Sequence, residues 1–390
     1  MEVVPLGMGS QRLIAHFDLD AFFVSVECLL DPALKGIPLA VGGQSDRSVI
    51  AACSYEARKY GVHSAMPARN ALRLCPHLKI VSGTRSAYSH YSRLVTEMIA
   101  NAAPVFEKAS IDEFYIDLSG MDRYFKPLEW TLALREKIIE ETKLPISFGM
   151  GSNKMIAKIA TDVAKPNSFL FIEPGKEAAF LDPMKVGKIP GVGDQTERDL
   201  LQLGIETIRE LRLAKTDLLT RHLGKYGTVL WNKAQGIHTS EVSPYQEAKS
   251  VSTENTFDKD VSDINFLQEE LVRMTEKVAY EMRQDNKMTG CIAVKIRYPD
   301  FETTTKQATI PYTFYDDELI PQAKLLFQQL YNQRQPVRLI GVRLSELTAD
   351  ARQTNLFQDA SRKADLYKAI DAVKNKFGRE AINLAGGMKK

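Results

Sequence analysis

Two runs of strand and helix patterns most constrain how this chain can fold. The second run begins after the polar segment "HTSEVSPYQEAKS" (residues 238–250). The first run ends near residue 172 and reads β-α-β-β-α-β, and the second, residues 251–349, has the same order. This order is typical of a small α+β unit whose antiparallel sheet carries helices on one face. The pattern between the two runs is helical. At 390 residues the chain exceeds one ordinary core, so we expect an α+β multidomain protein.

The composition is that of a soluble globular protein, with 44% hydrophobic and 26% charged residues. The four cysteines form no CxxC pair, which argues against a zinc site or a disulfide framework and fits a reducing cytosol. They are Cys28, Cys53, Cys75 and Cys291. There is neither a basic leader followed by an apolar core nor an apolar run of about 18 residues. We therefore expect no signal peptide, no membrane span and a cytoplasmic location.

The net charge of +2 conceals an uneven distribution. Residues 241–350 carry 13 basic and 18 acidic side chains, whereas residues 351–390 carry 9 basic and 4 acidic ones. No segment is basic enough for composition alone to indicate a nucleic-acid partner. Such a partner must be argued from the position of individual charges.

The segment "KASIDEFYIDLSG" (residues 108–120) places Asp112 and Glu113 side by side in an otherwise β-prone sequence. Neighbouring side chains on a strand point to opposite faces, but at the tip of a hairpin they could point toward one region. The N-terminal strand has Asp18 and Asp20 on one face, and packing it beside the hairpin would make three carboxylates converge. Oxygen-only ligand sets suit Mg²⁺ or Mn²⁺, and two such ions support in-line phosphoryl transfer. The alternatives are an ordinary polar turn for the pair and a structural role for Asp20.

The helix expected over residues 153–165 carries lysines on one side. Lys154, Lys158 and Lys165 fall within roughly 40° of one another at 100° per residue. Met155, Ile159 and Val163 occupy the other side and should face a core. Such a stripe is commonly a solvated face, but beside a carboxylate cluster its lysines could hold phosphates.

Two further segments suit a nucleic-acid backbone. "IPGVGDQTERDLLQLGI" (residues 189–205) is similar to a helix-hairpin-helix element, whose glycines Gly191 and Gly193 would let backbone amides approach a phosphate; the alternative is a simple turn between helices. Lys295 and Arg297 alternate on one face of the strand "CIAVKIRYP" (residues 291–299) and suit a strand laid along DNA.

Five motifs give these features a common context. "DLDAFFVSVE", "YEARKYGV", "SIDEFYID", "GSNKMIAKIATDVAKP" and "IPGVG" occur in this order, and together they resemble a Y-family DNA polymerase of the DinB or DNA polymerase IV branch. The resemblance runs from about residue 12 to about residue 347. It implies a template-directed translesion DNA polymerase of low fidelity, and no segment resembles a proofreading exonuclease.

The resemblance also implies a right-hand architecture of palm, small fingers, helical thumb and little finger. The expected parts are a palm at residues 12–21 and 84–172, fingers at 22–83, a thumb at 173–241, a linker at 242–250, a little finger at 251–349 and a tail at 350–390. In the fingers, small residues would leave an open roof over the base pair, which fits tolerance of distorted templates; they are Ala51, Ala52, Ser64 and Ala65.

By resemblance, Asp18, Asp112 and Glu113 are catalytic metal ligands, joined by the backbone carbonyl of Leu19, for two Mg²⁺ ions that Mn²⁺ could replace. Phe23 matches the steric gate, an aromatic ring that leaves no room for a 2′-hydroxyl; periodicity alone would make Phe17, Phe22 and Phe23 core residues. The implied nucleotide-binding residues are Phe22, Phe23, Tyr55, Arg58 and Lys165. The implied DNA-binding residues are Ser110, Lys154, Gly191, Gly193, Lys295 and Arg297.

The segment "QTNLF" resembles the pentapeptide with which bacterial polymerases dock into the sliding clamp, and Gln353, Leu356 and Phe357 would be its anchors. The expected partners are therefore primer-template DNA, a dNTP and the clamp, with no membrane and a monomeric chain. An amphipathic basic helix follows in residues 359–385, and it could pack on the little finger or touch DNA.

Two other functions compete with a polymerase. A palm-fold nucleotidyl cyclase would also use paired carboxylates, but it should carry a GG[DE]EF-like turn and no DNA-binding thumb. A catalytically inactive DNA-binding or clamp-associated scaffold should have lost metal ligands, whereas Asp18, Asp112 and Glu113 are all present.

Overall fold

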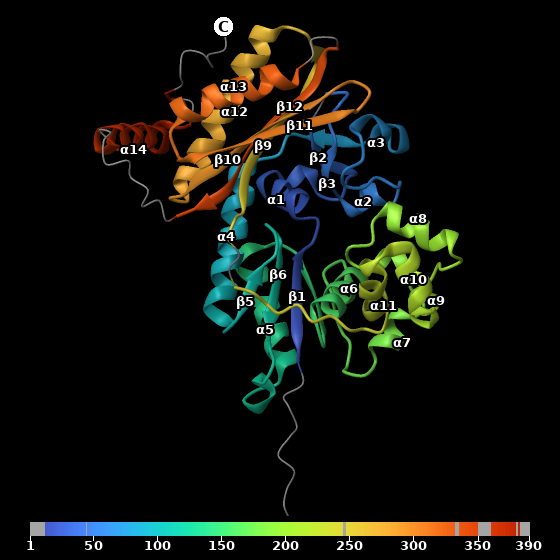
Figure 1. The fold of residues 1–390 in the computed structure, drawn as a ribbon. Helices are drawn as coiled ribbons and strands as arrows, with labels where there is room; N and C mark the ends of the chain where they lie inside the picture. Colours follow the sequence, from blue (N-terminus) through green and yellow to red (C-terminus); the bar gives the residue numbers. More distant parts are fainter. Residues whose placement is uncertain are drawn as a thin grey trace, which may run out of the picture. The chain divides into compact units, whose positions relative to one another are not determined.

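The computed structural model describes residues 12–43, 45–244, 247–331, 335–349, 360–379 and 381–382. The chain divides into two compact units, Met1–Gln246 and Glu247–Lys390. Both are built from strands and helices (Figure 1).

A five-stranded sheet forms the centre of the first unit, in the order β5-β6-β1-β7-β8. Its strands are β1 (Ile14–Leu19), β5 (Phe106–Lys108), β6 (Glu113–Asp117), β7 (Ile146–Gly151) and β8 (Phe169–Phe171). The pairs β5/β6, β6/β1 and β1/β7 are antiparallel. The pair β7/β8 is parallel, so the expectation of a wholly antiparallel sheet is wrong at this edge.

Helices cover both faces of this sheet, and the expectation of helices on one face is therefore also wrong. Phe17 and Leu19 point into a core shared with α4 (Arg85–Ala102) and α5 (Pro127–Thr142). The opposite face carries α6 (Lys154–Ala164), which packs against β1 and β7. A Cβ on Gly149 would lie 2.2 Å from the Ala157 carbonyl oxygen, so glycine permits this close approach.

Helix α6 agrees with the sequence pattern apart from one residue. Asn153 is its N-cap and accepts a hydrogen bond from the Ile156 amide. Met155 and Ile159 are buried as expected, but Val163 is 54% exposed. Val163 has the angular position of a core residue, so its exposure reflects its place in the last turn of the helix.

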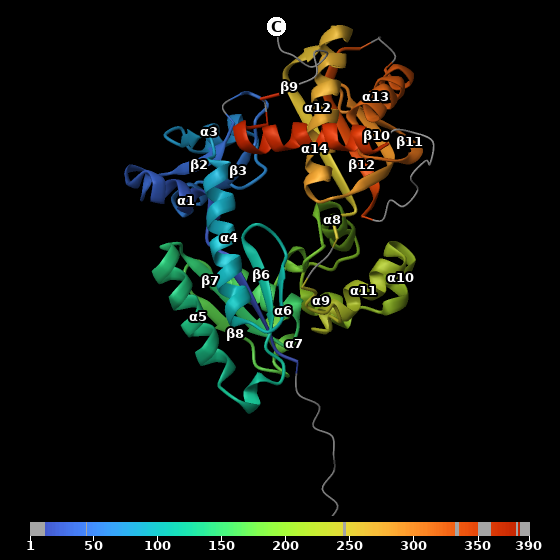
Figure 2. The same cartoon turned by 90° about the vertical axis from the view of Figure 1, so that its left-hand side faces the viewer.

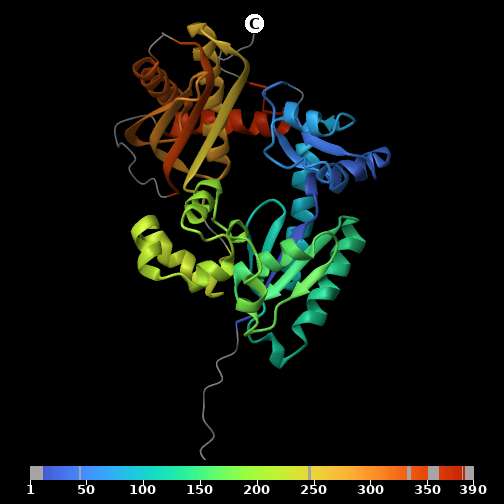
Figure 3. The ribbon, with the colours of Figure 1, turned by 90° about the vertical axis from the view of Figure 1, so that its right-hand side faces the viewer.

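Two smaller groups of elements complete the first unit. A three-stranded sheet in the order β3-β2-β4 has its own small core. It comprises β2 (Leu39–Gly42), β3 (Ile50–Cys53) and β4 (Lys79–Val81), with the helices α1 (Phe22–Leu30), α2 (Tyr55–Arg58) and α3 (Ala68–Leu74). Residues 177–234 are helical, drawn in green to yellow-green in Figure 3. Their helices are α7 (Glu177–Leu181), α8 (Asp194–Gln202), α9 (Ile208–Leu213), α10 (Thr216–Leu223) and α11 (Lys225–Ala234).

The second unit is a four-stranded antiparallel sheet in the order β11-β10-β12-β9, with α12 and α13 packed on one face. Its elements are β9 (Ser250–Val261), α12 (Ile264–Gln284), β10 (Met288–Arg297), β11 (Thr303–Thr313), α13 (Asp316–Leu330), β12 (Val337–Thr348) and α14 (Ala360–Phe377). This is the strand and helix order expected from the sequence.

Helix α14 lies beside α12 (Figure 2), and a buried charge network holds it there. The Arg283 guanidinium of α12 donates to Asp371 of α14 and to Asp316 at the start of α13. The Tyr367 hydroxyl of α14 donates to Asp317 at 2.9 Å. The basic helix expected after residue 359 thus packs on the second unit as far as Phe377.

Candidate active site

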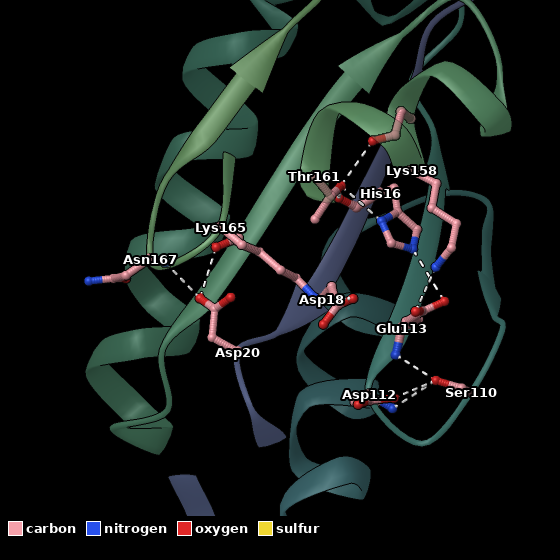
Figure 4. Close-up of polar contacts among 12 residues, drawn as sticks. His16, Asp18, Asp20, Ser110, Asp112, Glu113, Lys158, Thr161, Lys165 and Asn167 are labelled. Atoms are coloured by element: carbon pink, nitrogen blue, oxygen red, sulfur yellow. Dashed lines mark hydrogen bonds and ion pairs between the residues drawn. The ribbon is translucent and has the colours of Figure 1, made fainter. Parts of the chain in front are cut away.

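The end of β1 brings two of the expected carboxylates together. Asp18 pairs across the strands with Glu113, the first residue of β6. On the other side Asp18 pairs with Ser147 of β7. Asp18 is only 5% exposed, so its charge is largely removed from water. Figure 4 shows the Asp18 and Glu113 side chains close to each other.

A tight turn explains why Asp112 and Glu113 are neighbours. The amides of Ala109 and Ser110 both donate to the Glu113 carbonyl oxygen. The Ser110 hydroxyl donates to Asp112 Oδ1 at 2.6 Å and accepts from the amides of Asp112 and Glu113. The expected hairpin is confirmed, but Glu113 begins the strand and only Asp112 lies in the turn. Ser110, expected at DNA, is here a structural part of that turn.

Lysines of the α6 segment neutralise the two paired carboxylates. Lys165 Nζ lies 2.5 Å from Asp18 Oδ2, and Lys158 Nζ lies 2.6 Å from Glu113 Oε1. Burial raises the pKa of Asp18 to about 7, although Lys165 opposes this shift. His16 and Lys158 lower the pKa of Glu113 to about 2. Lys165 already opposes the effect of burial on Asp18, and a further cation beside Asp18 would favour its charged form in the same way.

Sequence reasoning missed His16 and Thr161, which lie beneath these carboxylates. His16 is fully buried; its Nδ1 lies 2.9 Å from Thr161 Oγ1, and its Nε2 lies 3.6 Å from Glu113 Oε2. Burial lowers the pKa of His16, which favours the neutral imidazole. The available signal was His16 sharing a strand face with Asp18, since a buried face that carries polar residues needs partners.

The donor set fits a hard divalent cation. Within the described residues, no three His, Cys, Asp or Glu side chains lie close enough to hold a metal ion. The convergence of three carboxylate side chains is therefore not found as expected, because Asp112 is hydrogen-bonded to Ser110 within the turn. All the candidate ligands are oxygens, however, and Asp18 and Glu113 are already adjacent. Such oxygen sets suit Mg²⁺ and Mn²⁺.

The aromatic residues that follow Asp20 differ in exposure. Phe22 is 3% exposed and belongs to the core. Phe23 is half-buried and its ring stacks on Tyr88 at 4.3 Å between centroids. The Tyr88 hydroxyl in turn donates to the buried Glu27 carboxylate. Tyr88 and Glu27 therefore hold Phe23 in place, which sequence reasoning missed.

Tyr55 and Arg58 of α2 share a face as expected, with the guanidinium carbon 4.6 Å from the Tyr55 ring centroid. Arg58 is exposed. The Tyr55 hydroxyl donates to Asp20 Oδ1 at 3.2 Å. Burial, with Asp20 nearby, raises the pKa of Tyr55, so this hydroxyl keeps its proton.

The remaining residues of the first unit expected at DNA have different surroundings. Lys154 Nζ donates to both carboxylate oxygens of Glu107 at 2.7 Å and lies over the Tyr115 ring. Gly191 has a φ of 94°, a conformation that favours glycine, whereas Gly193 has a φ of −96° at the N-cap of α8. The Tyr226 hydroxyl donates to the Gly191 carbonyl oxygen.

In the second unit Lys295 and Arg297 lie on the sheet face opposite α12, because their neighbours Val294 and Ile296 point into the core. Lys295 forms an ion pair with Glu254, and Arg297 Nε donates to the Thr303 hydroxyl at 2.8 Å. Arg343 of β12 is exposed on the same face, opposite Ala293 in the register. The clamp residues Gln353, Leu356 and Phe357 lie outside the described residues.

No helix among the described residues is long and apolar enough to cross a membrane. All four cysteines are free, and three of them are buried.

Comparison with known proteins agrees with the motifs over most of the chain. Three family descriptions match: the impB/mucB/samB family over residues 17–162, the thumb domain of DNA polymerase-iota over 187–238, and the impB/mucB/samB family C-terminal domain over 248–356. DNA polymerase IV of Dehalococcoides mccartyi is 37% identical over 94% of this chain and 95% of its own length. DNA polymerase IV of Methanoculleus marisnigri is 38% identical over 86% of this chain and 94% of its own length.

The fold agrees as well. A solved Y-family DNA polymerase chimera of Dbh and Dpo4 superposes with a TM-score of 0.78 at 26% identity, covering 87% of this chain and all of the chimera. Sequence and fold lead to the same assignment. The chain belongs to the Y-family of DNA polymerases, in its DNA polymerase IV branch, and is a DNA-directed DNA polymerase.

Proposed function

We propose that this polymerase extends a primer with Asp18, Asp112, Glu113 and the Leu19 carbonyl as ligands of two Mg²⁺ ions, for which Mn²⁺ could substitute. The observation that supports this most is the pairing of Asp18 with Glu113 beside the turn that carries Asp112. Bound divalent ions would activate the primer 3′-hydroxyl and neutralise charge on the triphosphate. The 3′-hydroxyl attacks the α-phosphate of a dNTP, and pyrophosphate leaves.

The triphosphate would be held by three side chains and one helix end. Lys165 is placed beside Asp18, and the exposed Arg58 offers a planar guanidinium for bidentate contacts. Tyr55 adds a protonated hydroxyl. The first turn of α1, which contains Phe22 and Phe23, has backbone amides without partners in the helix and suits an anion. Phe22 would contribute its backbone, because its side chain is buried.

Sugar selection is assigned to Phe23. Its ring is half-buried and supported by stacking on Tyr88, so it cannot turn aside without losing that contact. A rigid ring below the sugar would exclude a 2′-hydroxyl. Small side chains in the fingers would leave room for distorted bases, and this supports low-fidelity translesion synthesis; Ala51, Ser64 and Ala65 are exposed and Ala52 is half-buried.

The DNA backbone would be held by neutral and cationic groups. Gly191 and Gly193 precede α8 and leave its first amides accessible. The open sheet face with Lys295, Arg297 and Arg343 would supply cations despite the net acidity of this segment. Ser110 and Lys154 could contact DNA only by giving up the hydrogen bonds that they make now.

The clamp contact through Gln353, Leu356 and Phe357 remains a proposal from sequence, as does a monomeric chain. A cytoplasmic location is supported by the four free thiols. Replacing all three clamp residues by alanine should abolish stimulation by a bacterial sliding clamp without changing extension in its absence. Equal stimulation of both proteins would reject the clamp proposal.

The catalytic assignment is tested by primer extension with and without Mg²⁺. Asp18→Asn and Glu113→Gln should each lower the rate by at least about a hundredfold, as removal of transition-state charge stabilisation typically does. Asp117→Asn is the matched control, because Asp117 is a carboxylate at the other end of β6. Rates in Asp18→Asn and Glu113→Gln that match the control would reject the proposed metal site.

A further inference from the structure

Asp20 is a buried carboxylate that the proposed reaction does not use. It directly follows β1 and is only 1% exposed. Its amide donates to the Pro145 carbonyl oxygen at 2.9 Å, and its carbonyl oxygen accepts from the Ser25 hydroxyl at 2.6 Å. The backbone on both sides of the side chain is therefore held, which fixes the direction in which the carboxylate points.

Three donors from separate segments converge on this carboxylate. The Tyr55 hydroxyl donates to Oδ1 at 3.2 Å. The Ser147 hydroxyl and the backbone amide of Asn167 both donate to Oδ2 at 2.8 Å. Figure 4 shows Asp20 facing Asn167, with the Lys165 side chain extending from the same turn toward Asp18. Asp20 thus contacts α2, β7 and the turn after α6 at one point.

Two of these segments carry groups that hold the triphosphate in the proposed function. Tyr55 is stacked with Arg58, and Lys165 is two residues before Asn167. Asn167 is also held from the other side, because Arg135 donates to its carbonyl oxygen at 2.8 Å and to its Oδ1 at 2.6 Å. A change at Asp20 would therefore free Tyr55 and remove one of the two anchors of the Lys165 turn, leaving Arg135 as the other.

We propose that Asp20 is a positioning residue for binding of the incoming triphosphate. It fixes the position of Tyr55 and Arg58, on the fingers side, relative to Lys165, on the palm side. This inference rests on the proposed function of those three residues. Asp20 itself would contact neither substrate nor metal, because its carboxylate is engaged by these three donors. Its role explains why the second acidic residue of "DLD" is buried among neutral donors beside a metal site.

The chemistry of the three partners favours a carboxylate. A carboxylate only accepts hydrogen bonds, and all three groups can donate to it. The Tyr55 and Ser147 hydroxyls could rotate and accept a hydrogen bond instead, but the backbone amide of Asn167 can only donate one. In Asp20→Asn the side-chain oxygen should therefore stay with Asn167, and the new amide group should face Tyr55. In Asp20→Ala both connections are lost.

Single-nucleotide insertion separates positioning from folding. Asp20→Ala should raise KM for the dNTP by about tenfold or more, since two hydrogen bonds of about 1 kcal/mol each are lost, with a smaller change in kcat. Asp20→Asn should recover part of this loss. Ser147→Ala removes one donor to Asp20 and the acceptor of the Ser168 amide, but it leaves Tyr55 and Asn167 on the Asp20 carboxylate, so its KM should rise less than that of Asp20→Ala. Thermal melting of each variant records whether it is folded.

Hydrogen exchange without nucleotide gives a second readout that does not depend on activity. Peptides covering residues 55–58 and 165–168 should exchange faster in Asp20→Ala, and both should exchange more slowly in Asp20→Asn than in Asp20→Ala. An active wild type together with unchanged KM and unchanged exchange in Asp20→Ala would overturn the inference. A wild type without Mg²⁺-dependent extension would instead overturn the proposed function.

Discussion

Replacing Arg283 by methionine should release α14 from the second unit. The Arg283 and Asp316 side chains are 6% and 5% exposed, and that of Asp371 is 12% exposed. Methionine keeps the apolar stem but leaves two nearly buried carboxylates without their cation. Breaking a buried ion pair by removing one partner costs about 3–5 kcal/mol. We expect the opening free energy of α14 to fall by about that amount.

The assay is hydrogen exchange of peptides from residues 360–377, because both tryptophans, Trp130 and Trp231, lie in the first unit and would not report on α14. A loss of about 3 kcal/mol corresponds to more than a hundredfold loss of protection. Lys368→Met is the matched control, since its pair with Asp365 is highly exposed and contributes little. Equal protection in Arg283→Met and the control would refute this account of α14.

The same variant should respond to pH with a defined sign. Burial raises the pKa of Asp316 even with Arg283 beside it. A carboxyl whose pKa is raised on folding keeps its proton longer in the folded state, so it destabilises that state as pH rises above its unfolded pKa. Removing the guanidinium enlarges this penalty. Lowering the pH toward about 5 should therefore restore protection of α14 in Arg283→Met, after correction for intrinsic exchange.

Three further predictions concern the first unit. Phe23→Ala should raise ribonucleotide incorporation while much DNA synthesis remains, and a ribonucleotide-to-deoxynucleotide ratio equal to that of wild type would sink the steric-gate assignment. Gly191→Ala should lower the free energy of unfolding by about 1–2 kcal/mol, because a φ of 94° disfavours a residue with a Cβ. It should also weaken DNA binding more than Gly193→Ala, and equal DNA binding by the two variants would contradict this. Thr161→Val should lower stability by about 1–3 kcal/mol by leaving His16 Nδ1 without its partner, and an unchanged melting temperature would count against it.

The sequence was sufficient for the hairpin that carries the acidic pair, because an adjacent Asp and Glu between two apolar strands require a turn. It was also sufficient for α6 and its lysine side, since the buried and charged positions differ in angle. The expected ends of that helix were nearly right. The exposure of Val163 was not foreseen, because periodicity does not show at which turn the helix leaves the core.

The placement of α6 could not be read from sequence, for a physical reason. The polar residues His16 and Asp18 make one face of β1 look open in the sequence, although every residue of the strand is buried, so the pattern does not reveal that α6 covers this face. His16 gave only the signal of a polar residue on the Asp18 face, and the partners of His16 and Asp20 come from distant segments that the sequence does not place. Helix α14 is held by ion pairs with α12 and α13 rather than by a strong apolar stripe, so its docking needed the structure.

We expect the turn residue Asp112 to complete a metal site with Asp18 and Glu113. The direct measurement is the rate of Mg²⁺-dependent insertion of one dNTP by wild type and Asp112→Ala, with Asp117→Asn as the control. Wild type and the control should insert the nucleotide, and the rate in Asp112→Ala should be at least about a hundredfold lower. Insertion by a folded Asp112→Ala protein at the wild-type rate, or no insertion by wild type, would contradict it.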